Sequence, residues 1–532
     1  MTAMSPFFAS SAPTDTEPPS YVHAVPSTLP RGRMSVADLL AFFIGGAALV
    51  YAWFEQYAVD AETTLLPWLI RRGWVLYADL VDQHPPLLPW LLVPFDGDPG
   101  QPLRVAIFAL RAVTLLSTYV VARRLCGAWG ALVALSGAAL WAIGANAAHL
   151  WYDGALAPVY LGIVFLLVEQ DNFSTRIGDL PRAAAQIRLA VVLGGLLAVA
   201  MLLKQHAVLA LPGVLLALAW DRPGRGRRIT AFACGVILPI ALVAMYFVWQ
   251  GAGEPAAYWT IVYSLEGNYA AAASLTPPPS ETMWLLAAFA PLAALALAGT
   301  LRGARNVADR YYRLLIAGPG LLLAAILPVW PRYGRFHLQA AIPLLSLAAG
   351  VTAVTLFHVL RQRGWRARPN FAAATLLLAA YFVVGASEGI TSFRIQSQLP
   401  PVSPPYASTL PPLADWVDRH TARDAPIVLF GVDELVYRVL AHPPPKPWVP
   451  QLAWILTTQG AGARWWDGVV RARPSVALVA ESWWDSGPPA SNEPGPGWLR
   501  ANYHADARFV LIPYPGAASV SVVGLLINDG GP

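Results

Sequence analysis

The chain has 532 residues; 56% are hydrophobic and only 13% are charged, whereas soluble domains carry about 25% charged residues. This composition excludes an ordinary soluble enzyme. The net charge of +5 does not indicate nucleic-acid binding, because the arginines lie in short segments between apolar runs, with no basic helix or zinc-ligand spacing. The two cysteines, Cys126 and Cys234, fall at or in predicted helices, so a disulfide framework is not expected.

The N-terminal segment 1–34 is rich in Pro, Ser and Thr and has no apolar core. It is predicted to be a disordered cytoplasmic tail. The first apolar run, 36–54, is long enough to cross a membrane, and no small-residue cleavage site follows it. It therefore predicts a membrane helix and not a cleavable signal peptide.

Apolar segments of membrane-crossing length recur through the first 390 residues. Such a helix needs about 20 mostly apolar residues. The candidates are 36–54, 103–122, 129–148, 153–169, 188–203, 205–220, 229–250, 282–301, 311–329, 337–358 and 370–388. The fold class expected is a mainly α, polytopic membrane bundle of about 11 helices, spanning 35–390.

The arginines give this bundle an orientation. They concentrate in alternate loops, around 123–124, 176–188, 222–228, 302–313 and 361–368. Loops rich in arginine face the cytoplasm. The pattern places the N-terminus in the cytoplasm and the long loops 55–102 and 251–281 outside, in a plasma (inner) membrane.

The sequence pattern changes after residue 390. Segment 391–412 is a proline-rich linker, and 413–532 alternates short helical and β-type patterns, which predicts a small extracytoplasmic α/β domain. Its acidic pair Asp433-Glu434 and the run Trp465-Trp466-Asp467 are interpreted as ordinary loop features of that domain. No internal repeat of fixed period and no inverted repeat is apparent.

The first outer loop, 55–102, is the most informative segment. Asp60 and Glu62 follow directly after the first helix, and the piece 63–74 is amphipathic and is expected to lie flat at the interface. The two carboxylates are either solvated loop charges or include a catalytic base beside the membrane, which needs hydrogen-bond reach to a proton and a tuned pKa.

Two further elements follow in this loop, Gly73-x-x-x-Tyr77-x-Asp79 and Asp82-Gln83-His84-Pro85-Pro86-Leu87. The acidic pair and these elements together resemble the GT-C glycosyltransferases, in particular bacterial relatives of protein O-mannosyltransferases and of the aminoarabinose transferases. The resemblance covers most of 36–350. It implies a polyprenyl-phosphate sugar donor, chemistry at the outer face, and Asp60 as the base or the group that positions the acceptor.

The chain departs from that family at two positions. The family commonly has an adjacent Asp-Glu pair, whereas this chain has Asp60-Ala61-Glu62, which leaves open which carboxylate takes the main role. Aminoarabinose-type members have lysine where this chain has His84. Histidine need not be charged at neutral pH, so contact of His84 with the donor phosphate is in question, and a rigid turn is the alternative for His84-Pro85-Pro86.

Three more groups of polar residues fall at the predicted outer face. Asp153 matches a second acidic residue of the family, or it caps a helix. Lys204 is a candidate phosphate ligand, or it snorkels to the interface. Arg332 and Arg335 are arginines on the outer side, so they are expected to bind the donor phosphate, or with His337 to anchor the interface.

These patterns predict an inverting glycosyltransferase that moves a sugar from a polyprenyl-phosphate carrier to an extracytoplasmic glycolipid, cell-envelope polysaccharide or protein. Asp60, Glu62 and Asp153 would be catalytic. Lys204, Arg332, Arg335 and His84 would bind the phosphate, and Tyr77, Asp79, Asp82 and His337 would shape the acceptor loop. The alternatives are a lipid or solute transporter, or an inactive relative that acts as an assembly partner. No nucleotide-binding motif occurs. No cofactor is certain, and a divalent metal stays open.

Overall fold

The computed structural model describes residues 34–55, 57, 60–145, 147–176, 182–220, 224–266, 279–302, 309–330, 333–363, 369–398, 405–458, 460–513 and 517–528. The predicted N-terminal tail, apart from Met34, lies outside the described residues. Arg332 and much of the predicted loop 251–281 also lie outside them.

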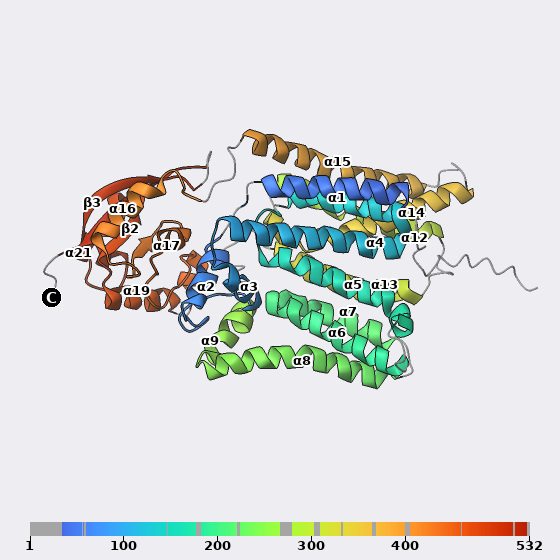
Figure 1. The fold of residues 1–532 in the computed structure, drawn as a ribbon, viewed down its shortest axis with the longest axis horizontal. Helices are drawn as coiled ribbons and strands as arrows, with labels where there is room; N and C mark the ends of the chain where they lie inside the picture. Colours follow the sequence, from blue (N-terminus) through green and yellow to red (C-terminus); the bar gives the residue numbers. More distant parts are fainter. Residues whose placement is uncertain are drawn as a thin grey trace, which may run out of the picture.

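Long apolar helices run side by side and form a bundle (Figure 1). They are α1 (Val36–Phe54), α4 (Gln101–Gly144), α5 (Tyr152–Arg176), α6 (Arg182–Leu203), α7 (Leu211–Ala219), α8 (Arg225–Trp249), α12 (Pro279–Arg302), α13 (Asp309–Ile326), α14 (Ala341–Arg363) and α15 (Pro369–Gln398). Among the described residues, 8 helices are long and apolar enough to cross a membrane, and Gln205–Ala219 and Arg313–Val329 are shorter apolar helices.

The span labelled α4 is two helices joined at a reversal of the chain. Gly127 has φ 76° and ψ −173°, which is not helical. Leu115 and Leu135, from the two sides of Gly127, both pack with Ala41 of α1. A straight helix of this length would measure about 66 Å, about twice the hydrocarbon core of a bilayer. With α4 divided there and the two shorter helices included, each of the eleven expected segments has a helical counterpart, and the predicted fold class is confirmed.

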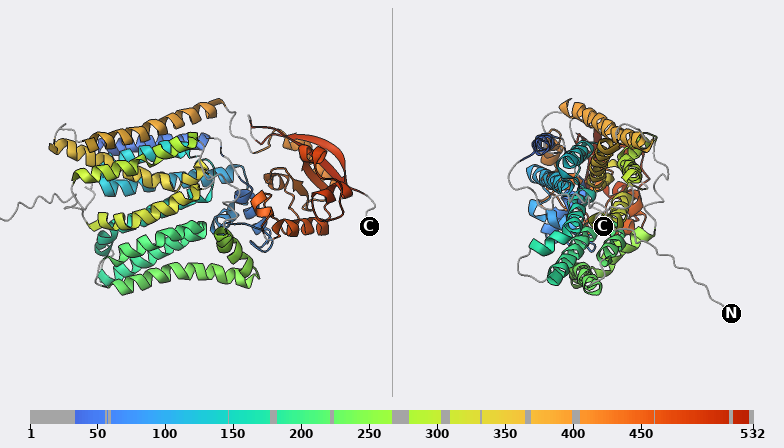
Figure 2. Two further views of the ribbon diagram at one scale, coloured as in Figure 1. Left: turned by 180° about the vertical axis from the view of Figure 1, so that it is seen from behind. Right: turned by 90° about the vertical axis from the view of Figure 1, so that its right-hand side faces the viewer.

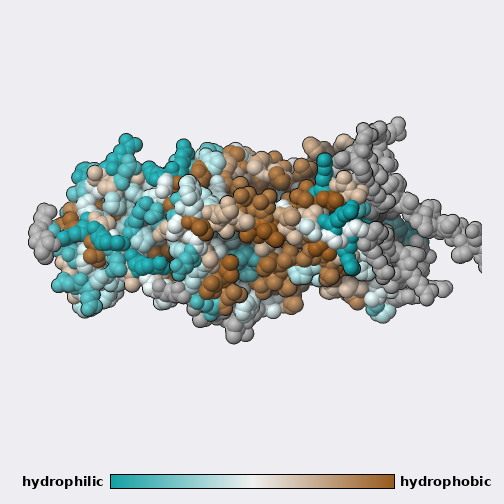
Figure 3. All heavy atoms as spheres, turned by 90° about the horizontal axis from the view of Figure 1, so that it is seen from below, coloured by the Kyte–Doolittle hydropathy of each residue, from teal (hydrophilic) through white to brown (hydrophobic). Residues whose placement is uncertain are grey.

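The surface of the bundle is apolar in a band. Figure 3 shows hydrophobic residues across the middle of the molecule, with hydrophilic residues gathered toward both ends. Large apolar side chains such as Phe42, Leu242, Val248 and Leu376 are exposed on it. Exposed apolar area of this extent is stable only when lipid covers it. The bundle is therefore an integral membrane domain.

Short elements lie between the bundle and the C-terminal domain (Figures 1 and 2). They include α2 (Ala61–Arg71), α3 (Leu87–Leu92), a 3-10 turn (Val93–Phe95) and α9 (Gly253–Ala257), which continues through Tyr258–Val262 and Tyr263–Leu265. The apolar face of α2 does not lie on lipid as the sequence suggested. Leu65, Leu66 and Leu69 are fully buried, because α3 and the C-terminal domain cover them.

The C-terminal domain is an α/β fold, as predicted. Its elements are α16 (Leu410–His420), β1 (Val428–Phe430), α17 (Leu435–Leu440), α18 (Ala453–Leu456), α19 (Ala461–Ala472), β2 (Val476–Ala480), α20 (Glu481–Ser486), α21 (Pro496–Asn502), β3 (Tyr503–Leu511) and β4 (Val520–Ile527). The sheet order is β1-β2-β4-β3, with β1 and β2 parallel and the other pairs antiparallel. Helix α15 runs to Gln398 and α16 begins at Leu410, both within the segment 391–412 assigned to a linker.

The domain is joined to loop 55–102 by main-chain hydrogen bonds. The amide of Val81 donates to the carbonyl of Trp448 at 3.0 Å, and the amide of Trp448 donates to the carbonyl of Asp79 at 2.8 Å. Lys446 adds an ion pair with Asp79 at 3.0 Å. Loop 55–102 is thus held between the membrane bundle and the tail.

Candidate active site

Asp60 lies at the rim of the bundle, where loop 55–102 follows α1. It immediately precedes α2, and its carbonyl accepts the Thr64 hydroxyl at 2.9 Å, but its carboxylate does not cap the helix. The carboxylate instead bonds Nε2 of His149, which lies between α4 and α5. The Asp60 side chain is 41% exposed and that of His149 is 11% exposed. The rim therefore presents an accessible carboxylate, and a histidine fixes its direction.

Asp153 forms a closed polar group deeper in the bundle. It lies in the first turn of α5 and is 0% exposed; its Oδ2 accepts from Lys204 Nζ at 2.5 Å and bonds His337 Nδ1 at 2.9 Å. Lys204 follows α6, and His337 lies in the short 3-10 helix Arg335–Leu338. Asp153 is therefore not simply a helix cap, and Lys204 does not snorkel to the interface.

Two atoms of this closed group are left without a partner. Asp153 Oδ1 and His337 Nε2 are buried, and no described residue bonds them. Burial, with the nearby Lys204 ammonium, lowers the pKa of His337 to about 4, so the ring is neutral at pH 7. With Nδ1–H donated to Asp153, Nε2 is an acceptor. Buried acceptors are normally satisfied, so these two atoms are open hydrogen-bonding positions inside the closed group.

The third polar group is built around Asp82 in loop 55–102. Asp82 Oδ1 accepts from the backbone amide of His84 at 3.0 Å and faces its Nδ1 at 2.9 Å. Asp82 Oδ2 accepts the hydroxyl of Tyr152 at 2.9 Å, and the carbonyl of His84 accepts the hydroxyl of Tyr77 at 2.7 Å. Both Asp82 and His84 are buried. The imidazole of His84 is therefore held in one orientation.

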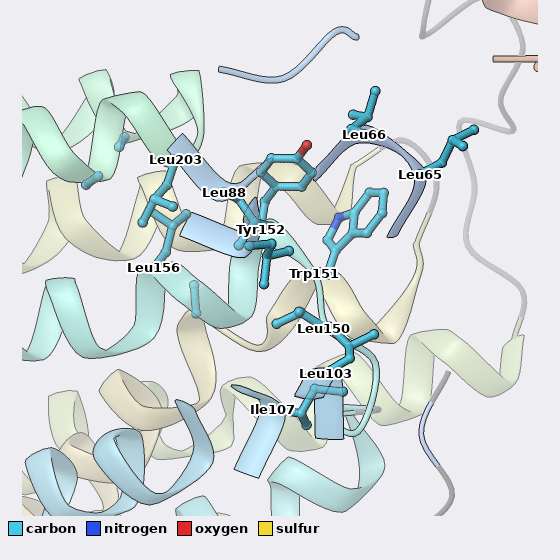
Figure 4. Packing of buried hydrophobic residues seen from close by; sticks show 14 of the residues in the cluster. Leu65, Leu66, Leu88, Leu103, Ile107, Leu150, Trp151, Tyr152, Leu156 and Leu203 are labelled. Atoms are coloured by element: carbon cyan, nitrogen blue, oxygen red, sulfur yellow. The ribbon is translucent and has the colours of Figure 1, made fainter. Parts of the chain in front are cut away.

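Aromatic rings connect the three groups. The His84 ring stacks on Tyr152 with ring centroids 4.0 Å apart, and Trp151 lies edge-on to His84 at 5.4 Å. Phe336 contacts both His149, at 5.1 Å, and Trp151, at 5.5 Å. Figure 4 shows Trp151 and Tyr152 within the packed apolar residues that surround them. Asp60, Asp82 and Asp153 therefore flank one aromatic wall at one end of the bundle.

An apolar cavity reaches this wall from within the bundle. Its enclosed volume is small, about 50 Å³, and both halves of α4, α5 and α14 line it. The polar side chains among its lining include Arg111, His149 and Gln339. Since His149 also bonds Asp60, the cavity connects apolar space at membrane depth with the rim.

The remaining predicted residues take other positions. Glu62 lies partly buried in the first turn of α2. Arg335 bonds Glu281 at 3.0 Å and Glu388 at 2.8 Å, and its guanidinium lies over Trp284 at 5.0 Å. These contacts already compensate its charge. No contact joins it to Lys204 in the described structure, and Arg332 lies outside that part. That Lys204, Arg332 and Arg335 lie together around one phosphate thus stays a prediction.

Sequence reasoning missed several partners of the predicted residues. His149 received no role, and Glu281 and Glu388 were not connected with Arg335. Hydrophobic patterning gives no signal for a pair such as His149 and Asp60, which lie 89 residues apart. Within the described residues, no group of three or more His, Cys, Asp or Glu side chains is arranged to hold a metal ion.

Comparison with known proteins gives matches at the level of structure only. No family model and no curated protein matches the sequence. ArnT from Cupriavidus metallidurans, bound to undecaprenyl phosphate, matches with a TM-score of 0.41 and 14% identity, covering 91% of this chain and 97% of that chain. The archaeal oligosaccharyltransferase AglB from Archaeoglobus fulgidus, in complex with an inhibitory peptide and a dolichol-phosphate, matches with a TM-score of 0.48 and 12% identity, covering 84% and 69%. Identity is too low for any residue role to be transferred from them.

Proposed function

We propose that this protein is a membrane glycosyltransferase that moves a sugar from a polyprenyl-phosphate carrier to an extracytoplasmic acceptor. One observation carries the proposal: an accessible carboxylate, Asp60, and a closed polar group with two unsatisfied acceptors, around Asp153, flank one aromatic wall. Aromatic faces and unpaired hydrogen-bond acceptors are the groups that recognise a sugar.

The apolar cavity supports a lipid-linked donor. The isoprenoid chain would occupy apolar space at membrane depth, and its phosphate would lie toward the wall where the polar residues gather. Asp60 would take the proton of the acceptor hydroxyl or position that hydroxyl for in-line attack on the anomeric carbon, which inverts its configuration. Glu62 would play a lesser part, and Asp153 and Lys204 would hold the donor headgroup. Catalysis would consist mainly of placement and charge stabilisation.

The transporter alternative is less well supported. It requires ionisable residues near the bilayer midplane and broken helices in both halves of the bundle. In the described residues, Asp60 and Asp82 belong to loop 55–102, and Asp153 and Lys204 lie next to residues that contact this loop, Tyr152 and Gln205.

The direct test is an assay of the purified protein with a panel of polyprenyl-phosphate sugars, scored by release of the lipid phosphate. The expected result is sugar-dependent release with at least one donor, and none with Asp60→Asn. Absence of release from every donor and acceptor combination, together with movement of the intact lipid between leaflets of a vesicle, would favour the transporter.

The orientation is tested separately. We infer that the N-terminus is cytoplasmic and that the tail is extracytoplasmic, which places loop 55–102 outside. A reporter fused after residue 430 is expected to be active only in the extracytoplasmic compartment. Cytoplasmic activity of that fusion would put the whole site on the opposite side of the membrane.

A further inference from the structure

The group Asp82–His84–Tyr152 has an arrangement that phosphate binding alone does not require. Asp82 Oδ1 lies 2.9 Å from His84 Nδ1, and the other oxygen of Asp82 is fixed by the hydroxyl of Tyr152. The ring of His84 is also stacked on Tyr152. A carboxylate on one ring nitrogen fixes the tautomer and stabilises the protonated ring, and the opposite nitrogen is left to act.

That opposite nitrogen is available. No described residue bonds Nε2 of His84. It is not among the enclosed atoms without a partner, a group that includes His206 Nδ1 and His337 Nε2. Nε2 is therefore not completely enclosed, although the His84 side chain as a whole is only 7% exposed.

We propose that His84, oriented by Asp82, is the acid that protonates the departing lipid phosphate. The inference rests on the glycosyl transfer proposed above. The acceptor oxygen forms a bond to the anomeric carbon as the bond from that carbon to the phosphate oxygen breaks. The bonding electron pair passes to the phosphate, and the proton on Nε2 of His84 follows it. The products are the glycosylated acceptor, a monoanionic lipid phosphate and neutral His84, while Asp60 receives the acceptor proton.

The charges at this end of the bundle explain why a proton donor is needed. Lys204 is already bonded to Asp153, and Arg335 to Glu281 and Glu388. These two cations thus offer little uncompensated positive charge to a dianionic leaving group, which is costly in a low-dielectric site. Transfer of a proton removes one of the two negative charges at the moment they appear.

Several titratable groups surround His84 and will shape its pH dependence. They are Tyr77 and Asp82 in the outer loop, Glu62 in α2, Tyr152 and Asp153 in α5, Lys204 and His206 after α6, and His337 before α14. Of these, Asp82 is the carboxylate in direct contact with the ring. It is therefore the positioning residue for His84.

The test is the pH dependence of lipid-phosphate release by the full-length enzyme and four variants. His84→Gln should lower kcat by about 10²–10³, within the range of general acid catalysis, with KM for the donor changed less than threefold. The wild-type rate should fall at high pH (the alkaline limb of its pH profile), and this fall should be absent in His84→Gln. His84→Lys keeps a positive charge but is a poor acid at neutral pH, so it should remain at least tenfold slower than the wild type.

Asp82→Asn separates positioning from folding. Loss of the carboxylate removes its stabilisation of the imidazolium, so the alkaline limb should move to lower pH, whereas a structural defect lowers the rate equally at every pH. The matched control is His442→Gln, because His442 is another buried histidine beside an aspartate, Asp418, but lies in the tail. It should leave the profile unchanged.

The outcomes are distinct. If the wild type is active and His84→Gln has the same rate and pH profile, the role of His84 is overturned. The same holds if His84→Lys has the full wild-type rate and keeps the alkaline limb. In both cases the proposed transfer still stands. If His84→Gln does not fold, an unshifted limb in Asp82→Asn overturns it. Absence of release by the wild type removes the proposed function, and this inference falls with it.

Discussion

The rim around Asp60 and the closed group around Asp153 use the same residue types in opposite ways. The Asp60 side chain is 41% exposed and has one histidine partner, whereas Asp153 is 0% exposed and shares one oxygen between Lys204 and His337. A buried charge is tolerated only when it is paired, and removing its partner costs stability. An open carboxylate carries no such requirement, so it is free to take a role in the reaction. Loss of the Asp60 charge should therefore affect mainly the rate, whereas loss of the cation that pairs with Asp153 should also affect the fold.

The largest effect is expected at the rim. Asp60→Asn preserves the shape of the side chain and removes its charge, so the transfer rate should fall by about 10²–10⁴. The melting temperature in detergent should stay within one or two degrees of the wild type. The matched control, Glu62→Gln, should be milder in rate. If Glu62→Gln abolished transfer and Asp60→Asn did not, the roles of the two carboxylates would be exchanged.

Substitutions in the closed group around Asp153 should lower the stability of the folded protein. Lys204→Met leaves the Asp153 carboxylate buried without its cation, which should lower the free energy of unfolding by about 3–5 kcal/mol. The double variant Lys204→Met, Asp153→Asn removes both charges and should recover much of that loss. Unfolding in detergent, followed by heat or denaturant, measures both. Equal instability of the single and double variants would show that the pairing of charge is not what stabilises this region.

A carboxylate in the tail extends the comparison. Glu434 is partly buried and accepts from Trp448 Nε1 at 3.1 Å, and burial raises its pKa from 4.5 to about 8. Between these values the folded state binds more protons than the unfolded state, so stability is lost as pH rises from about 4.5 to 8. Glu434→Gln should therefore be more stable than the wild type at pH 8, on the order of 1–3 kcal/mol, and equal to it at pH 4.5. Parallel melting curves at the two pH values test this, and a constant difference contradicts it.

The smallest effect is expected at the exposed ion pair between the tail and the outer loop. Lys446 and Asp79 have side chains 49% and 28% exposed. Pairs of this kind contribute about 0.2–1 kcal/mol and are screened by salt. Lys446→Gln should therefore shift melting by a degree or two at low salt and less at high salt. A large shift at all salt concentrations would mean that the pair, and not the main-chain bonds beside it, holds the tail in place.

The bundle was predictable from sequence because each crossing is a local property. A run such as 229–250 must form a helix in lipid whatever surrounds it, since the bilayer offers no other partner to its backbone. The strands of the tail were predictable for a similar reason, because β2 (Val476–Ala480) and β4 (Val520–Ile527) are short, mostly apolar runs within 413–532, where β-type patterns are predicted.

The site was predictable only as a set of residues and not as a set of contacts. Asp60, Asp82 and Asp153 were all selected, but the partners that distinguish them were not assigned. Lys204 lies 51 residues from Asp153, and His337 lies 184 residues from it. Pairs at such separations depend on the packing of helices, which periodicity and composition do not encode. The amphipathic piece 63–74 shows the same limit, because its apolar face fits lipid or protein equally well.

The main-chain bonds between Trp448 and the segment Asp79–Val81 have a consequence for how this chain can diverge. Amide and carbonyl groups are present at every residue except for the amide of proline. The junction between tail and loop is thus largely indifferent to the side chains at these positions. Proteins with a different loop or a different tail can keep the same junction while the rim and the tail surface change independently. Substitutions in the tail can then accumulate without disturbing the carboxylates that the loop presents.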